Sequence, residues 1–197
     1  LKLLKKSKKP LITIGYGVRS SKDTISNLKK IISKYKIPFT TTWNGSDIFS
    51  TNHNLNLGII GMSGQRGANK AMFEADLILC FGTHLSIPHT TTLFDSYAKQ
   101  AKKIIVNIDK NQLNNLNVKF DLKINCDLEL FFKTLLKKKL NFNNEWRNLN
   151  QIKQLNWYEP ISKKNINSNF AVRIITKKIK NKCIIVDGGG TALYAGF

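Results

Sequence analysis

The sequence has little arginine, although it is strongly basic. Lysine and arginine together number 32, against 12 acidic residues, which gives a formal net charge of +20. Planar, bidentate recognition of phosphates and guanines relies on arginine, whereas lysine is the usual solvated surface cation. Abundant lysine together with asparagine and isoleucine is also typical of A/T-rich codon usage. We therefore expect no nucleic-acid partner. The only arginines are Arg19, Arg66, Arg147 and Arg173.

Paired cysteines and long apolar runs are also missing. Cys80, Cys126 and Cys183 are far apart, with no CxxC spacing, which is typical of a reducing cytoplasm rather than a disulfide framework. No apolar run approaches the roughly 18–20 residues of a membrane span, and no signal peptide is visible. We expect a cytoplasmic protein without a membrane partner. Its 42% hydrophobic residues are enough to bury a core.

Short apolar runs alternate with amphipathic stretches, a pattern that predicts an α/β fold with a parallel sheet flanked by helices. A helix capped by Ser20 or Ser21 carries Ile25, Leu28, Ile31 and Ile32 on one face. Other helices are expected over 67–74 and 128–136, and a glycine-punctuated loop over Gly58–Gly67. The expected strands are 10–14, 37–42, 75–82, 103–109 and 120–124.

The composition changes after residue 136, which indicates a boundary. Residues 1–136 are predicted to form a central domain. Residues 137–169 are predicted to form a connection rich in Lys and Asn, with a helix and a connecting segment whose aromatics pack onto neighbours. Residues 170–197 then read as the first helix, strand and turn of a second α/β domain. Because the chain starts at Leu1 rather than Met and stops at Phe197 in an apolar run, we expect both ends to be cuts.

Two glycine-rich segments are candidate ligand sites. Gly15 and Gly17 follow the first strand and precede a helix, where a backbone can approach a dinucleotide phosphate. The third glycine of the usual dinucleotide fingerprint is missing, so a plain strand-to-helix turn is equally consistent. The loop with Gly61, Met62 and Gly64 precedes Arg66, which could pair with an anion or anchor a domain interface.

Further candidates stand at the ends of later strands. Gly82 and His84 end the predicted central strand, at the edge where open α/β sheets bind ligands. Asp109 ends the next strand and could hold a ribose hydroxyl or cap a helix. His53, His84 and His89 have no companions at metal-ligand spacing, so we predict loop or packing roles for them and no metal site.

A last glycine-rich turn ends the strand expected over 183–187. It opens a helix, and such a turn is a ready phosphate cradle. The residues of this turn are Gly188, Gly189, Gly190 and Thr191.

Six sequence blocks occur in a fixed order along the chain. They are PFTTTWN at 38–44, GMSGQRGAN at 61–69, ADLIL at 75–79, FGT at 81–83, VNID at 106–109 and IIVDGGGT at 184–191. Taken in this order, the blocks resemble thiamine-diphosphate-dependent enzymes of the acetolactate synthase group. The resemblance covers about residues 7–136 for the family's central domain, which is Rossmann-like, of the DHS-like NAD/FAD-binding type, and 184–191 resembles the opening of its diphosphate-binding domain.

The resemblance implies a fragment of a 2-keto acid decarboxylase or carboligase that uses thiamine diphosphate and Mg²⁺ and works as a homodimer or homotetramer. In this family a glutamate of the N-terminal domain activates the cofactor, and a Gly-Asp-Gly…Asn motif of the C-terminal domain holds Mg²⁺ and diphosphate. The sequence contains neither, so the chain alone is expected to be inert and to carry no catalytic residue.

The resemblance also bears on FAD, which synthase-type relatives bind in this domain. Gly15, Gly17, Gly61, Met62, Gly64, Gly82 and Asp109 match positions that would line that site. His84 departs from the pattern, since FAD-holding relatives commonly have an arginine there that pairs with the phosphates. Histidine is shorter and mostly neutral at pH 7, so a cation is lost. Gly188–Thr191 fall where the first diphosphate-contacting loop begins.

Two other function classes compete with the enzyme fragment. One is a stand-alone FAD- or NAD-binding module of the electron-transfer flavoprotein or sirtuin type, which leaves the strand and turn at 183–191 unexplained. The other is a basic nucleic-acid binder, which would have to show affinity at low salt.

Overall fold

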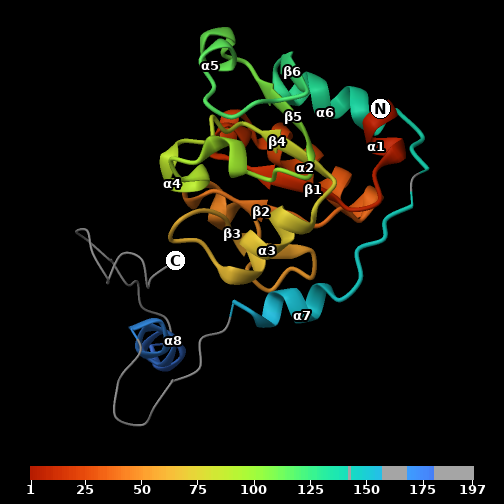
Figure 1. Ribbon diagram of the computed structural model, residues 1–197. Helices are drawn as coiled ribbons and strands as arrows, with labels where there is room; N and C mark the ends of the chain where they lie inside the picture. The colour runs from red at the N-terminus through yellow and green to blue at the C-terminus, as the bar shows by residue number, and fades with distance from the viewer. Residues whose placement is uncertain (142, 157–167, 180–197) are drawn as a thin grey trace.

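A single parallel sheet organises the domain (Figure 1). The structure is a computed structural model that describes residues 1–141, 143–156 and 168–179. The six strands lie in the order β3-β2-β1-β4-β5-β6, and every neighbouring pair is parallel. This confirms the predicted α/β fold. The strands are β1 (Pro10–Ile14), β2 (Phe39–Thr41), β3 (Asn56–Ile59), β4 (Leu77–Phe81), β5 (Lys102–Asn107) and β6 (Leu122–Asn125).

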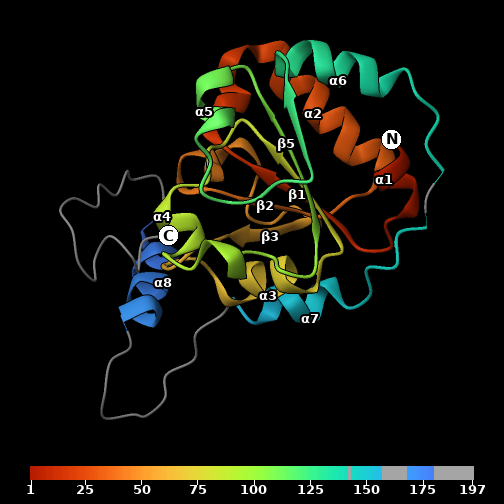
Figure 2. The same ribbon diagram turned by 45° about the horizontal axis from the view of Figure 1, so that its top comes forward.

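Helices cover both faces of this sheet. Figure 2 shows α1, α2 and α6 on one side and α3 and α7 on the other. In the part of the chain described, the α-helices are α1 (Lys2–Lys6), α2 (Lys22–Tyr35), α3 (Arg66–Glu74), α4 (Ile87–Thr90), α5 (Lys110–Asn114), α6 (Leu128–Leu136), α7 (Leu149–Gln154) and α8 (Ser168–Lys178), with 3-10 turns η1 (Tyr16–Ser20), η2 (Trp43–Ile48) and η3 (Phe94–Ser96).

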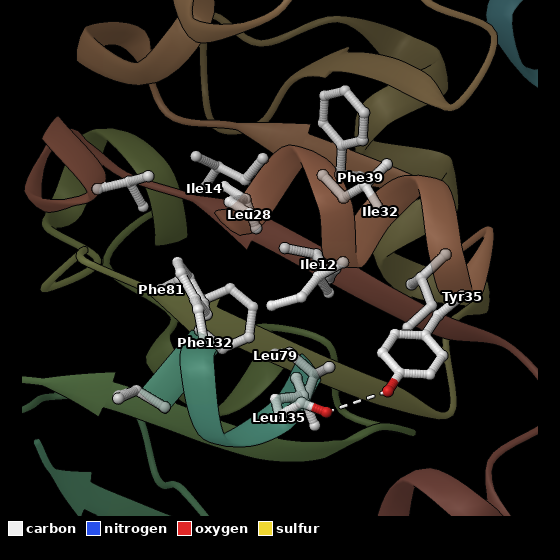
Figure 3. Close-up of a cluster of buried hydrophobic side chains, with 14 of the residues drawn as sticks. Ile12, Ile14, Leu28, Ile32, Tyr35, Phe39, Leu79, Phe81, Phe132 and Leu135 are labelled. Carbon is white, nitrogen blue, oxygen red and sulfur yellow. Dashed lines mark hydrogen bonds between the residues drawn. The ribbon is translucent and has the colours of Figure 1, made fainter. Parts of the chain in front are cut away.

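The two faces contain separate cores because side chains alternate along a strand. In β1 and β4, Ile12, Ile14, Leu79 and Phe81 face the α2 and α6 side. Figure 3 shows these residues packed with Leu28 and Ile32 of α2 and Phe132 and Leu135 of α6. Burial on both faces explains the uninterrupted apolar strand sequences. The opposite core includes Leu11, Ile78, Cys80, Ile105, Ala68, Ala71 and Met72.

Most predicted elements are confirmed within a few residues, but the loop expected over Gly58–Gly67 is a correction. Its first residues belong to β3, and α3 already begins at Arg66, so the connecting loop is only 60–65. The strand contains Asn56 and Gly58, and Gly58 has a φ of 105°. Neither residue type favours a strand, so the segment showed no apolar run. The helix predicted after residue 170 is α8, whereas the strand at 183–187 lies outside the described residues.

A strap, which we define as residues 137–156, crosses from one face of the sheet to the other. Both views show it running past α1 and the chain start, from α6 to α7 (Figures 1 and 2). The Trp146 indole Nε1 donates to the Pro10 carbonyl at 2.7 Å, and Trp146 is buried. Glu145 N donates to Lys8 O at 2.7 Å and Asn144 Nδ2 to Lys36 O at 2.8 Å. The strap thus packs against the sheet, as predicted for Trp146; residue 142 is not described.

Candidate functional site

The strand order places a switch point between β1 and β4. The chain moves outward from β1 to β2 and β3, and then returns to lay β4 on the other side of β1. Ligands of open α/β sheets bind beyond the carboxyl ends of the strands at such a point. The residues predicted from the sequence at 15, 17, 61, 62, 64, 66, 82 and 109 all follow these carboxyl ends.

The first of these groups is a close contact between two backbone turns. Gly15 N donates to Phe81 O and Gly17 N to Gly82 O, both at 2.9 Å. A Cβ added at Gly15 would lie 2.3 Å from Gly82 O and 2.5 Å from Thr83 Cβ. One added at Gly17 would lie 2.9 Å from the Gly82 Cα. These glycines therefore allow the turn after β1 to pack on the turn after β4.

The second group, the loop after β3, packs on α4. Gly61 N donates to Asn69 Oδ1 at 3.0 Å, and Asn69 Nδ2 returns a bond to Gly61 O at 2.9 Å. Met62 N donates to Pro88 O at 2.9 Å, and a Cβ at Gly61 would lie 2.2 Å from the same oxygen. Gly64 N donates to Gly61 O at 3.0 Å. Arg66, the first residue of α3, is exposed.

Asp109 is a helix cap. Its Oδ1 accepts from Asn111 N at 2.8 Å and from Gln112 N at 3.1 Å, at the start of α5. The sequence allowed Asp109 either to cap a helix or to hold a ribose hydroxyl, and the structure shows the capping hydrogen bonds. Exposed Ile108 precedes it on the same edge.

A hollow of about 570 Å³ lies between the loop after β4 and α5. It is lined by residues 84–88 on one side and by Asn111, Gln112 and residues 115–117 on the other. His84 is exposed at its rim. The hollow therefore offers amide, hydroxyl and imidazole groups, and none of its lining residues is a lysine or an arginine.

The histidines and cysteines of the described part of the chain do not gather into a metal-binding cluster. No group of three or more His, Cys, Asp or Glu could hold a metal ion there. His89 Nδ1 lies 3.1 Å from Ser86 Oγ, and burial, with a smaller effect of His84, lowers the pKa of His89 to about 4. Burial raises the pKa of the Cys80 thiol to about 12, so this thiol is a core residue and not a nucleophile.

Asn156 is a site-edge residue that the sequence did not single out. Its Oδ1 accepts from Gly67 N at 2.7 Å, and its Nδ2 donates to Leu57 O at 2.8 Å. It thus joins the start of α3 to β3 from the end of the strap. No local pattern marks such a residue, because its partners are distant along the chain. The turn predicted at Gly188, Gly189, Gly190 and Thr191 lies outside the described residues.

This geometry agrees with a match to a family model. The central domain of thiamine pyrophosphate enzymes matches residues 1–135, which is the sheet domain through α6. The chain belongs to this family.

Relatives of this family member include acetolactate synthases. The probable acetolactate synthase large subunit of Methanococcus aeolicus is 33% identical over 82% of the chain and 27% of its own length. The large subunit of Lactococcus lactis is 31% identical over 93% of the chain and 32% of its own length. The 3D-(3,5/4)-trihydroxycyclohexane-1,2-dione hydrolase of Clostridium tetani is 35% identical over 64% of the chain and 20% of its own length. The chain thus spans a third or less of these relatives.

Family membership decides between two of the function classes predicted from the sequence. A thiamine pyrophosphate enzyme domain is favoured over a stand-alone FAD or NAD module. None of the helices in the described ranges is long and apolar enough to cross a membrane.

Proposed function

We propose that the protein to which this domain belongs is a thiamine-diphosphate-dependent 2-keto acid carboligase or decarboxylase of the acetolactate synthase type. The observation that carries the proposal is the family match over residues 1–135, together with synthase large subunits among the relatives. We propose Mg²⁺ as the metal, a homodimer or homotetramer as the assembly, and the cytoplasm as the location. Nucleic acid and membrane are not among the proposed partners.

The described residues would act as a scaffold in this enzyme. When bound, thiamine diphosphate supplies the electron sink that allows a 2-keto acid to lose CO₂, and the protein supplies position and electrostatics. Among the described residues, no group of three or more His, Cys, Asp or Glu could hold a metal ion. Ser86 Oγ lies 3.1 Å from His89 Nδ1, but burial lowers the pKa of His89 to about 4, so this imidazole is a weak base. Residues 188–191, which by resemblance begin the first diphosphate-contacting loop, lie outside the described part of the chain. The domain alone would therefore be inert.

The test of this proposal is an assay of the full-length protein. With thiamine diphosphate and Mg²⁺ we expect release of CO₂ from pyruvate or another short 2-keto acid, and formation of a 2-hydroxy-2-methyl-3-keto acid product. The 197-residue chain under the same conditions should release none. Turnover that does not depend on thiamine diphosphate, or no turnover of any 2-keto acid, would contradict the proposal.

A second candidate reaction has support from the Clostridium tetani relative, which is 35% identical to the chain. That protein's name describes hydrolysis of a cyclic 1,2-dione. The same full-length preparation should be offered a trihydroxycyclohexane-1,2-dione in parallel with pyruvate. Consumption of the dione with no turnover of 2-keto acids would assign the hydrolase reaction instead.

A further inference from the structure

The turns at the carboxyl edge of the sheet use their amide donors within the chain. The N–H groups of Gly15, Gly17, Gly61, Met62 and Gly64 all donate to acceptors of the domain at 2.9–3.0 Å. Gly82 N also donates, to Val106 O at 3.3 Å. A dinucleotide diphosphate is normally held by backbone N–H groups that point at the ligand and by a helix N-terminus. At this edge, the glycine N–H groups do not point outward.

At the starts of α2 and α3, which also begin at this edge, backbone N–H groups donate to side chains. Thr24 N, in the first turn of α2, donates to Ser21 Oγ at 3.0 Å, and Ser21 in turn contacts the Glu129 carboxylate at 2.8 Å. Gly67 N, at the start of α3, donates to Asn156 Oδ1 at 2.7 Å. Both helix starts therefore have protein oxygens where an anion would otherwise accept hydrogen bonds.

Charges of both signs stand along this edge. Arg66 and Lys110 are exposed at the starts of α3 and α5, whereas the charged groups in the turns that follow β1 and β5 are less favourable to a diphosphate. Arg19 forms an ion pair with Asp47 and lies over the Tyr16 ring. Asp109 places a carboxylate at the start of α5. The hollow beside His84 is lined by neutral amides rather than by cations. A diphosphate carries two negative charges and is held most strongly by charge-assisted bonds from arginine or lysine.

From these contacts we infer that the domain does not hold FAD and that the enzyme proposed above is flavin-independent. That the protein is an enzyme rests on the proposed function. That it lacks FAD is inferred from the backbone N–H groups at the sheet edge, which already donate to acceptors within the chain. The residues that match a flavin site by sequence do not fit the diphosphate. In this chain Gly15, Gly17 and Gly82 serve the close packing of two backbone turns instead.

The test is flavin analysis of the purified full-length protein. After denaturation, the supernatant should contain no FAD by fluorescence, and saturating FAD should leave the thermal midpoint unchanged. Recovery of one FAD per chain, or a midpoint that rises with FAD concentration, would overturn the inference. Thiamine diphosphate, added separately, is the positive control, because it should raise the midpoint of the same preparation.

A variant distinguishes a missing cation from the missing amide donors. His84→Arg places a long cation beside the hollow but leaves the N–H groups of Gly15, Gly17, Gly61, Gly64 and Gly82 bonded within the chain. We expect His84→Arg to remain free of flavin. If the variant purifies with FAD, the lack of free backbone N–H donors does not prevent FAD binding, and the inference is wrong.

The outcomes also separate this inference from the proposed function. A flavin-free protein that decarboxylates 2-keto acids supports both. A flavin-free protein with no thiamine-dependent turnover leaves the inference standing and removes the proposed function. An active protein with bound FAD supports the proposed function and overturns the inference.

Discussion

At the scale of single residues, the close approach of two turns makes Gly15 sensitive to substitution. Gly15→Ala would place a Cβ 2.3 Å from Gly82 O, against backbone that cannot move independently of β4. We expect the free energy of unfolding to fall by about 1–3 kcal/mol, the usual cost of overpacking. Urea denaturation measures it. Tyr16→Ala, at an adjacent residue that is 63% exposed, is the control and should change stability by less than about 0.5 kcal/mol.

We expect His89 to make the stability of the domain depend on pH. Burial, with a smaller effect of His84, lowers its pKa from 6.5 to about 4 in the folded state. Between these pH values the unfolded chain binds a proton that the folded chain does not, so stability is full above about pH 6.5 and falls as the pH is lowered toward 4. Because the ring is only partly buried, solvent screening reduces this contribution to about 1–2 kcal/mol.

The measurement is a comparison of His89→Gln with the parent chain by urea denaturation from pH 4.5 to 8. The variant should lose less stability on acidification, while above pH 7 the difference between the two proteins should stay constant. Equal slopes at acidic pH would show that His89 does not titrate differently in the two states.

At the scale of elements, the strap depends on one buried hydrogen bond. Trp146→Phe removes the indole N–H that donates to Pro10 O and leaves that carbonyl without the donor, in a buried place. We expect a loss of about 1–3 kcal/mol in the free energy of unfolding. Arg147→Ala changes an exposed neighbour and should cost less than about 0.5 kcal/mol. If both variants cost the same, the indole bond does not hold the strap.

The elements that could be predicted from sequence are those whose own residues determine them. β1 and β4 are buried along their whole length and β5 from Ile104 onward, so they appear as apolar runs. Helix α2 has both an apolar face and the Ser21 cap. β3 was not predicted because Asn56 and Gly58 do not favour a strand by themselves. The segment is a strand because it pairs with β2 in the folded sheet. The short helices α1 and α4 were also missed, since neither spans two turns.

The site could be predicted less completely than the fold. The sequence placed glycines at strand ends correctly, but it could not indicate which acceptors their N–H groups would meet. Those acceptors come from other strands and loops, as with Gly17 and Gly82 O. Asn156 reaches Gly67 from 89 positions away, so only the folded chain reveals it.

At the scale of the whole molecule, the net charge of +20 works against compactness. The screening length falls from about 30 Å at 0.01 M salt to about 8 Å at 0.15 M, so added salt weakens repulsion among the lysines. We expect the urea midpoint of the chain to rise over this range. The double variant Lys137→Glu/Lys139→Glu, at two exposed positions, should show a smaller rise. A midpoint that falls with salt would mean that the surface ion pairs outweigh the repulsion.

The strap also sets an order of events during synthesis. The Pro10 carbonyl, at the start of β1, accepts a hydrogen bond from the Trp146 indole, which is synthesised 136 residues later. Gly67 N, at the start of α3, likewise donates to Asn156, which is synthesised 89 residues later. A chain translated only through the sheet therefore lacks the indole donor of the Pro10 carbonyl and the amide acceptor of Gly67 N at the start of α3. Nascent chains that end before residue 146 should accordingly be cut by protease more readily than chains that extend past residue 156.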